Sequence, residues 1–129
     1  MMSGKAAAYW TATLLFSALM AYDAYAYLTR DPRMTAAMAE LGYPSYFPII
    51  LGIAKSLGVA ALLVPGMPRT KEWAYAGFSF TLIGAFFSHL ASGQHHEAAM
   101  PLLALIVMVF SYLMRPPMRR ILEAAAAVR

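Results

Sequence analysis

The chain has 129 residues, of which 61% are hydrophobic and 12% are charged, and its formal net charge at pH 7 is +4. Soluble domains carry roughly 25% charged residues, so this balance argues against a soluble domain and favours a membrane protein. The chain has no cysteine, which excludes disulfides, thiolate metal sites and dithiol redox chemistry carried by the chain itself.

Four apolar segments run along the chain, at residues 7–28, 46–64, 73–91 and 99–114. Each is close to the ~20 residues that a helix needs to cross the hydrocarbon layer of a bilayer. The sequence therefore predicts an all-α fold: an integral membrane four-helix bundle that forms a single transmembrane domain over residues 1–129. The first segment loosely resembles a signal peptide, but its apolar run is too long for one, so we expect an uncleaved first helix.

Most basic residues fall on one side of the predicted spans, namely Lys5, Arg69, Lys71, Arg115, Arg119, Arg120 and Arg129. The other side holds only Arg30 and Arg33, which Asp31 and Glu40 offset. By the positive-inside rule, both termini are expected in the cytoplasm of a multi-pass protein of the inner (plasma) membrane. Membrane topology therefore accounts for the positive net charge, and no nucleic-acid partner is predicted.

A short amphipathic helix is predicted between the first and second spans. Its apolar residues recur at helical spacing and Gly42 follows them as a helix end; they are Met34, Ala37, Met38 and Leu41. We expect this helix either to lie on the outer surface or to cap the bundle.

The third span is expected to follow a turn at residues 64–69, which are rich in proline and glycine. Thr70 is the predicted N-cap of this helix, and Glu72 in its first turn would complement the helix dipole. After the fourth span, Pro116-Pro117 stops the helix, and residues 118–128 predict a final surface helix near the inner lipid head groups.

Lys55 stands at the centre of the second apolar segment. A lone ammonium group in hydrocarbon costs roughly 3 kcal/mol or more, so Lys55 should face protein and have a partner. Gly52 and Gly58 lie on the same helix face, where they allow another helix to approach closely. Gly77 and Gly84, seven residues apart in the third span, predict a second close-packing seam.

Asp23 and His89 are the other ionisable groups within the spans. At about 1.5 Å of rise per residue, both fall in the outer half of the bundle together with Lys55. Lys55 can extend on its four-carbon stem toward Asp23, so an ion pair is predicted. Three interpretations stay open: a structural pair that fixes helix register, a ligand-binding or proton-handling site, and two separately hydrated residues. His89 either bonds a carbonyl or water at the interface or binds a ligand head group.

Tyrosine hydroxyls add to this outer polar cluster, and Tyr22 and Tyr27 are counted as candidate site residues. An interfacial aromatic belt is the alternative explanation for them. Adjacent histidines in a short loop, His95 and His96 beside Glu97, are too weak a pattern to predict a metal site. No phosphate-binding loop, Ser-His-Asp spacing or catalytic carboxylate pair is present, so no enzyme activity is predicted.

Five stretches together resemble the DoxX-like family of small bacterial four-span membrane proteins, over nearly the whole chain. They are YWTATLL from Tyr9, ELGYPSYFPIILGIAKSLGVAALLVPG from Glu40, KEWAYAGFSF from Lys71, GAFFSHL from Gly84 and SYLMRPP from Ser111. The resemblance implies a four-helix membrane bundle and points to Lys55, Glu72, Trp73 and His89 as family positions. Family members typically carry Ser-Gly and then Lys late in the first helix, where this chain has Asp23-Ala24 and Tyr27.

The first hypothesis for function is a non-catalytic inner-membrane protein that binds a lipid or quinone-like molecule in an outer-half polar pocket, or that serves as the membrane subunit of a redox assembly. Relatives in the wider group are associated with membrane redox complexes, an analogy at the level of the fold. The alternative is a small proton-linked transporter that acts as an oligomer, and an oxidoreductase acting on quinones ranks below both. The expected partners are membrane lipids, a second copy or a redox-complex partner, and no cofactor is predicted in the chain itself.

Overall fold

The computed structural model describes residues 3–121 and 128, and this part of the chain is all helical, as predicted. Its elements are α1 (Gly4–Leu28), α2 (Pro32–Glu40), α3 (Phe47–Leu63), α4 (Pro68–Ala91), α5 (Ala99–Leu113) and the 3-10 helix η1 (Pro117–Arg119). The predicted final helix over residues 118–128 lies for most of its length outside the described residues.

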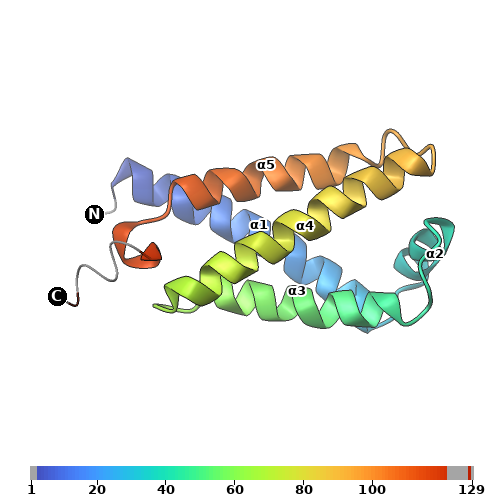
Figure 1. Cartoon of the computed structure of the whole chain (residues 1–129), viewed down its shortest axis with the longest axis horizontal. Helices are drawn as coiled ribbons and strands as arrows, with labels where there is room; N and C mark the ends of the chain where they lie inside the picture. The colour runs from blue at the N-terminus through green and yellow to red at the C-terminus, as the bar shows by residue number, and fades with distance from the viewer. Residues whose placement is uncertain (1–2, 122–127, 129) are drawn as a thin grey trace.

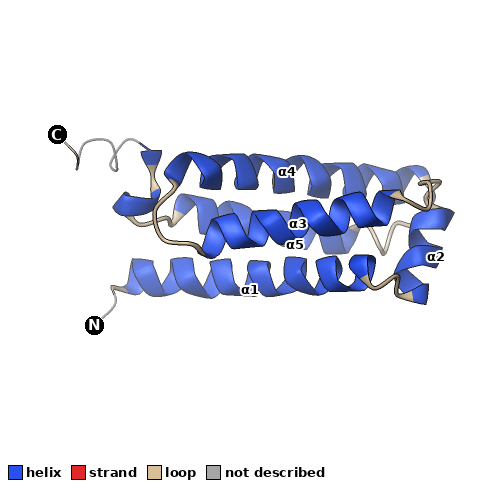
Figure 2. Ribbon diagram, turned by 90° about the horizontal axis from the view of Figure 1, so that it is seen from below, coloured by secondary structure: helices blue, strands red, loops and turns tan. Residues whose placement is uncertain are grey.

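The long helices α1, α3, α4 and α5 form an antiparallel bundle in which each packs against its neighbours in a ring (Figure 1). Helix α1 packs along α3 and α5, and α4 packs along α3 and α5. Helix α2 lies across one end of the bundle (Figure 2). We call this the α2 end, which also holds residues 92–98, and we call the opposite end, with η1 and the start of α1, the η1 end.

Local sequence signals explain three boundaries of the first two helices. Ser3 caps α1, because its Oγ accepts a hydrogen bond from the Ala6 N–H at 3.1 Å. Asp31 caps α2 in the same way, accepting from the Arg33 N–H at 2.9 Å. Gly42, with φ of +87°, supplies the left-handed residue that takes the chain away after α2.

Helix α4 begins earlier than predicted, and the prediction of Thr70 as its N-cap is wrong. The helix starts at Pro68, directly after Met67, whose carbonyl accepts the Lys71 N–H at 3.1 Å. Proline suits a first helical position because its fixed φ is already helical and its missing N–H would have no partner there. The turn is therefore shorter than the composition of residues 64–69 indicates.

The core lies midway along the bundle and is built around two aromatic rings. Phe16 of α1 and Phe78 of α4 meet edge to face, with ring centroids 5.0 Å apart and planes at 89°. Side chains from all four long helices surround them and complete the buried cluster: Met20, Leu62, Tyr75, Leu82, Ala104 and Met108.

The glycines of α3 allow close packing, as predicted, and those of α4 do not. A Cβ on Gly52 would lie 2.7 Å from Leu28 of α1, and one on Gly58 would lie 2.6 Å from the Phe78 ring. By contrast, no heavy atom lies within 4 Å of a Cβ placed on Gly77 or Gly84. The predicted close-packing seam on α4 is therefore wrong, because the face that carries these glycines meets open space.

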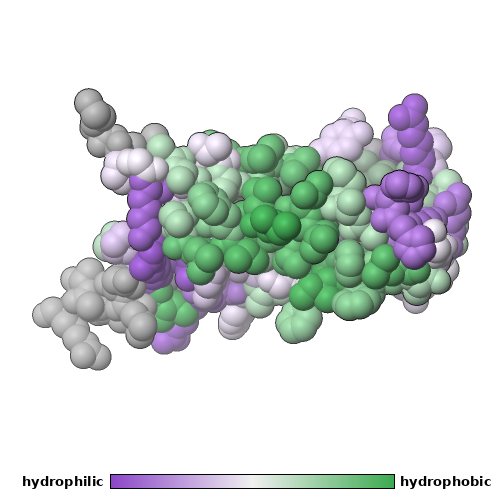
Figure 3. Space-filling model, turned by 90° about the horizontal axis from the view of Figure 1, so that it is seen from above, coloured by the Kyte–Doolittle hydropathy of each residue, from purple (hydrophilic) through white to green (hydrophobic). Residues whose placement is uncertain are grey.

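Within the described residues, α4 is the one helix that is long and apolar enough by itself to cross a membrane. Helices α3 and α5 are apolar but shorter, with 17 and 15 residues. Apolar side chains cover the middle of the bundle and hydrophilic ones gather at its two ends (Figure 3). The all-α prediction is confirmed with one candidate span, and the prediction of four spans stays a prediction.

Candidate functional site

A cavity of about 820 Å³ lies inside the α2 end of the bundle. This volume is within the roughly 300–1,000 Å³ typical of small-molecule sites. All five α-helices contribute to its wall, which is mostly apolar. Its polar and ionisable lining residues are Asp23, Tyr27, Tyr43, Lys55, Thr81, His89 and Glu97. The cavity thus contains three of the residues that the sequence marks as a polar cluster in the outer half, Asp23, Lys55 and His89.

Lys55 and Asp23 form the predicted ion pair in the wall of this cavity. The Lys55 Nζ donates to Asp23 Oδ2 at 2.7 Å and lies 5.1 Å from the centre of the Tyr27 ring. The pair is buried unevenly, since the Lys55 side chain is 7% exposed and the Asp23 side chain 29%. Asp23 and Tyr27 are one helical turn apart on α1, so both reach the same lysine.

His89 lines the cavity and joins a chain of hydrogen bonds. Its Nδ1 is 2.7 Å from Gln94 Oε1, and Gln94 Nε2 donates to Glu40 Oε2 at 3.4 Å. Nearby, the Tyr43 hydroxyl lies 2.5 Å from Ser88 Oγ. These contacts tie the end of α4 to the segment that carries α2 and the start of α3.

Helix α2 caps the bundle, which is one of the two positions predicted for it, the other being on the outer surface. The four apolar residues that recur at helical spacing all line the cavity: Met34, Ala37, Met38 and Leu41. The apolar face of α2 therefore closes the cavity from the end of the bundle.

Tyr22 does not belong to this site, although the sequence analysis includes it. Its side chain is 70% exposed and is not part of the cavity wall. Tyr27 does line the cavity. The difference follows from helix geometry: Tyr27 is four residues from Asp23 and shares its face, whereas Tyr22 is adjacent to Asp23 and points about 100° away.

Glu72 and Trp73, the other family positions, lie toward the η1 end and outside the cavity. Glu72 pairs with Arg115, whose guanidinium stacks 3.6 Å from the centre of the Tyr112 ring. The Tyr112 hydroxyl also donates to Glu72 at 3.0 Å. Trp73 is 78% exposed on the side of the bundle.

A second polar cluster, inside the η1 end, is absent from the sequence prediction. Ser111 Oγ lies 2.6 Å from Thr13 Oγ1 and 2.8 Å from the Tyr75 hydroxyl, and all three residues are buried. Lys71 is also buried and donates to the Val64 carbonyl and, at 2.6 Å, to the Gly66 carbonyl. Small hydroxyls in apolar helices carry little sequence signal, because each can bond within its own helix.

No cluster of three or more histidine, aspartate or glutamate side chains that suits a metal ion is found among the described residues. His95, His96 and Glu97 therefore form no such group, and the chemistry of the site is that of one ion pair, phenol groups and an imidazole.

Comparison with known proteins adds one finding to this geometry. The model of the DoxX-like family matches residues 11–111, a range that contains the cavity's ion pair, His89 and most of the bundle. No curated protein and no solved structure matches the chain significantly. The chain therefore belongs to the DoxX-like family.

Proposed function

We propose that this protein is a non-catalytic, multi-pass protein of the inner membrane that binds a lipid or quinone-like molecule in the cavity at its α2 end. The observation that carries this proposal is the cavity of about 820 Å³, whose mostly apolar wall holds an ion pair, a phenol and an imidazole. Sites of this kind bind amphiphilic small molecules, because apolar walls supply affinity and a few polar groups fix orientation.

The surface of the bundle supports the membrane part of the proposal. Large apolar side chains are exposed along every long helix, including Leu14, Leu15, Ile50, Ile53, Leu57, Phe80, Phe87, Leu103, Ile106 and Phe110. Such a continuous apolar surface is unfavourable in water and favourable in lipid. The antiparallel neighbours of α4 would cross the bilayer beside it.

The charges at the two ends support the orientation. Six basic residues lie at or near the η1 end, namely Lys5, Arg69, Lys71, Arg115, Arg119 and Arg120, whereas Arg30 and Arg33 lie at the α2 end. The η1 end would then face the cytoplasm and the cavity would lie in the outer half of the bilayer.

The polar groups of the cavity suit a ligand that accepts hydrogen bonds. An ammonium group has three N–H donors, and Asp23 is the one acceptor that the described residues provide for Lys55. The remaining donors and the Tyr27 hydroxyl are available to oxygen atoms of a ligand. Toward the η1 end, the buried cluster around Phe16 and Phe78 separates the cavity from the cytoplasmic side, which gives no support to the transporter alternative.

Co-purification tests the proposal, with Gly84→Leu as the variant that fills the cavity. Gly84 lines the cavity and has room for a side chain, so the leucine should occupy ligand space without disturbing helix packing. Ala76→Leu on the exposed face of α4 adds the same bulk outside the cavity. Molecules extracted from each protein in nanodiscs would be identified and counted by mass spectrometry.

We expect wild type and Ala76→Leu to retain one enriched lipid or quinone that Gly84→Leu loses. Identical extracts from all three proteins, matching the bulk lipid, would overturn the proposal.

A further inference from the structure

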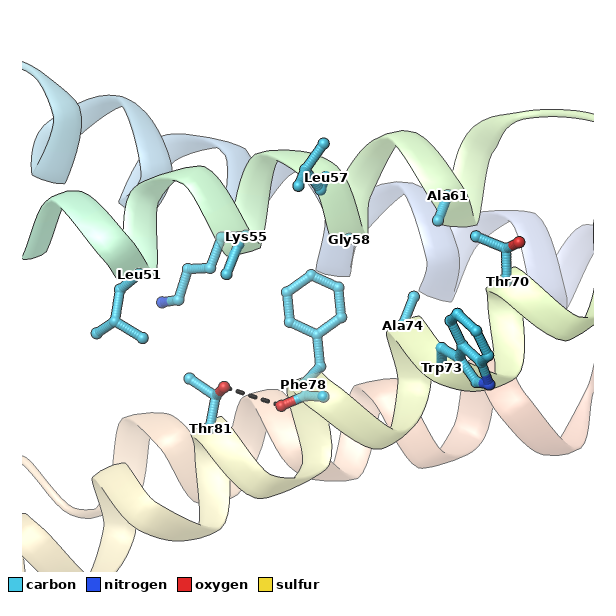
Figure 4. Close-up of a pocket in the computed structure, with 12 residues that line it drawn as sticks. Leu51, Lys55, Leu57, Gly58, Ala61, Thr70, Trp73, Ala74, Phe78 and Thr81 are labelled. Carbon is cyan, nitrogen blue, oxygen red and sulfur yellow. Dashed lines mark hydrogen bonds between the residues drawn. The ribbon is translucent and has the colours of Figure 1, made fainter.

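A groove of about 260 Å³ lies on the side of the bundle between α3 and α4 (Figure 4). It runs along these two helices from the middle of the bundle toward Trp73 near the η1 end. Three residues line both this groove and the cavity at the α2 end, namely Leu51, Lys55 and Thr81. The groove and the cavity are therefore adjacent, and the buried Lys55 lies at their junction.

Helices α3 and α4 pack together over part of their length and diverge toward the α2 end. At Gly58 the Phe78 ring packs directly against the α3 backbone. Toward the α2 end, α4 lies beside α5 and away from α3 (Figure 1). Gly77 and Gly84 add no side chains on this side of α4, and nothing lies within 4 Å of where a Cβ would be.

The groove suits an apolar chain, whereas the cavity suits a polar head. Thr81 donates to the Gly77 carbonyl at 2.8 Å, and Lys55 donates to Asp23, so both groups have partners within the protein. The side chains beside them in the groove are apolar and exposed, as at Leu57 with 68% and Trp73 with 78% of their surface accessible. Exposed apolar surface of this kind gains free energy when an apolar chain covers it.

We propose that the gap between α3 and α4 is a lateral portal from the bilayer into the cavity, and that the ligand is an uncharged amphiphile with a single apolar chain. Its polar head lies beside Lys55 and its chain leaves through the portal and follows the groove toward Trp73. This inference rests on the proposed function and specifies its ligand class and its route of access.

The head group is uncharged because the charges of the ion pair beside it already cancel. Lys55 and Asp23 neutralise each other at 2.7 Å, so a charged head in the same low-dielectric space would lack a counter-ion. The free N–H donors of Lys55 instead suit carbonyl, ester or hydroxyl oxygens.

Decylubiquinone and its head group without the decyl chain form a matched pair of probes for the groove. Trp73 reports binding through quenching of its fluorescence in a Trp10→Phe background, because Trp73 lines the groove. Gly77→Leu places a side chain in the groove and leaves the cavity wall unchanged. We expect this variant to bind decylubiquinone about tenfold more weakly and to bind the chainless head group as wild type does, since only the chain contacts are lost. Equal affinity of wild type and Gly77→Leu for decylubiquinone would overturn the placement of the chain.

Cross-linking tests the portal, and the absence of native cysteine makes introduced pairs unambiguous. Leu51→Cys with Thr81→Cys, joined by a bis-maleimide, ties α3 to α4 across the gap. The control pair, Thr13→Cys with Ser111→Cys, is joined by oxidation at the η1 end, where the native side chains are already 2.6 Å apart.

We expect the first cross-link to slow the exchange of decylubiquinone with lipid vesicles by about tenfold or more, and the control to leave the rate unchanged. An unchanged rate after the first cross-link would overturn the portal while leaving the proposed function intact. Failure of the wild-type protein to bind either probe would overturn both.

Discussion

Lys55 and Asp23 form an ion pair within an apolar bundle, and their two side chains differ in exposure. Lys55 is enclosed by α1, α3 and the Tyr27 ring, whereas nearly a third of the Asp23 side chain is accessible. A buried charge without its partner is costly, but an accessible one recovers part of its hydration. The two residues should therefore respond differently to removal of the other.

Asp23→Asn should destabilise the protein more than Lys55→Met does. The first change leaves the ammonium of Lys55 buried without a counter-ion, at a cost of about 3 kcal/mol in unfolding free energy. The second leaves the more accessible carboxylate of Asp23 unpaired, at a cost of about 1 kcal/mol. Unfolding in mixed detergent micelles, followed by circular dichroism, measures both.

The double variant Asp23→Asn with Lys55→Met serves as the control, because it removes both charges and should recover most of the lost stability. If Lys55→Met costs as much as Asp23→Asn, the unequal burial of the pair does not govern its energetics.

At the scale of the helices, α3 is the element that positions the site, because its glycines set its distance from both neighbours. Gly52 allows α1 to approach on the side that carries Asp23, and Gly58 allows Phe78 of α4 to approach on the other. Lys55 lies between these two contacts along α3, with its Nζ directed to Asp23 of α1. The same residue type on α4 has no such function, since Gly77 meets open space.

Gly58→Ala should destabilise the bundle by about 1–3 kcal/mol, because the added methyl group would overlap the Phe78 ring, which is held in the core against Phe16. Gly77→Ala is the matched control, and we expect it to stabilise α4 by about 0.5–1 kcal/mol, since alanine favours helix over glycine. Thermal unfolding of the two variants side by side distinguishes them. Equal effects of both substitutions would show that Gly58 acts only through helix propensity.

Helix α2 is short, so its stability depends on the hydrogen bonds that cap its ends. Asp31 accepts hydrogen bonds from the N–H groups of Arg33 and Met34 at the start of the helix. Asp31→Ala should therefore cost about 1 kcal/mol and increase opening of α2 over the cavity. Amide hydrogen exchange, resolved by segment, would show faster exchange in α2 with α3 unchanged. Ser3→Ala removes the corresponding cap of α1, and it should speed exchange only at the start of that helix.

At the scale of the whole molecule, the apolar middle and polar ends of the bundle support the proposal that it crosses a bilayer (Figure 3). The proposed orientation would put α2 and residues 92–98 outside and the turn between α3 and α4 inside. The apolar portal between α3 and α4 would then open to lipid, which suits a ligand that dissolves in the bilayer.

Cysteine labelling measures this orientation directly. His95→Cys in the loop after α4 should react with a membrane-impermeant maleimide in intact spheroplasts. Met67→Cys in the turn before α4 should react only after the membrane is broken. Both positions are exposed, so access depends on the side of the membrane and not on burial. The reverse pattern would reject the proposed orientation.

The sequence alone was sufficient to predict the all-α fold, the approximate range of each long helix and the pairing of Lys55 with Asp23. These features depend on local properties: runs of apolar residues, residues that begin and end helices, and the scarcity of charges in apolar segments. The error at the start of α4 is also local, since the composition of residues 64–69 predicts a turn that includes Pro68, whereas Pro68 takes the first helical position.

What each helix face meets depends on the packing of the whole bundle. Spacing places Gly52, Gly58, Gly77 and Gly84 on defined faces, yet only the first two contact another helix. Spacing likewise does not predict that Thr13, Tyr75 and Ser111, from three different helices, meet at the η1 end. The physical reason is that helical periodicity determines which residues share a face, whereas the crossing of four helices determines whether that face meets a neighbour, a cavity or the surroundings.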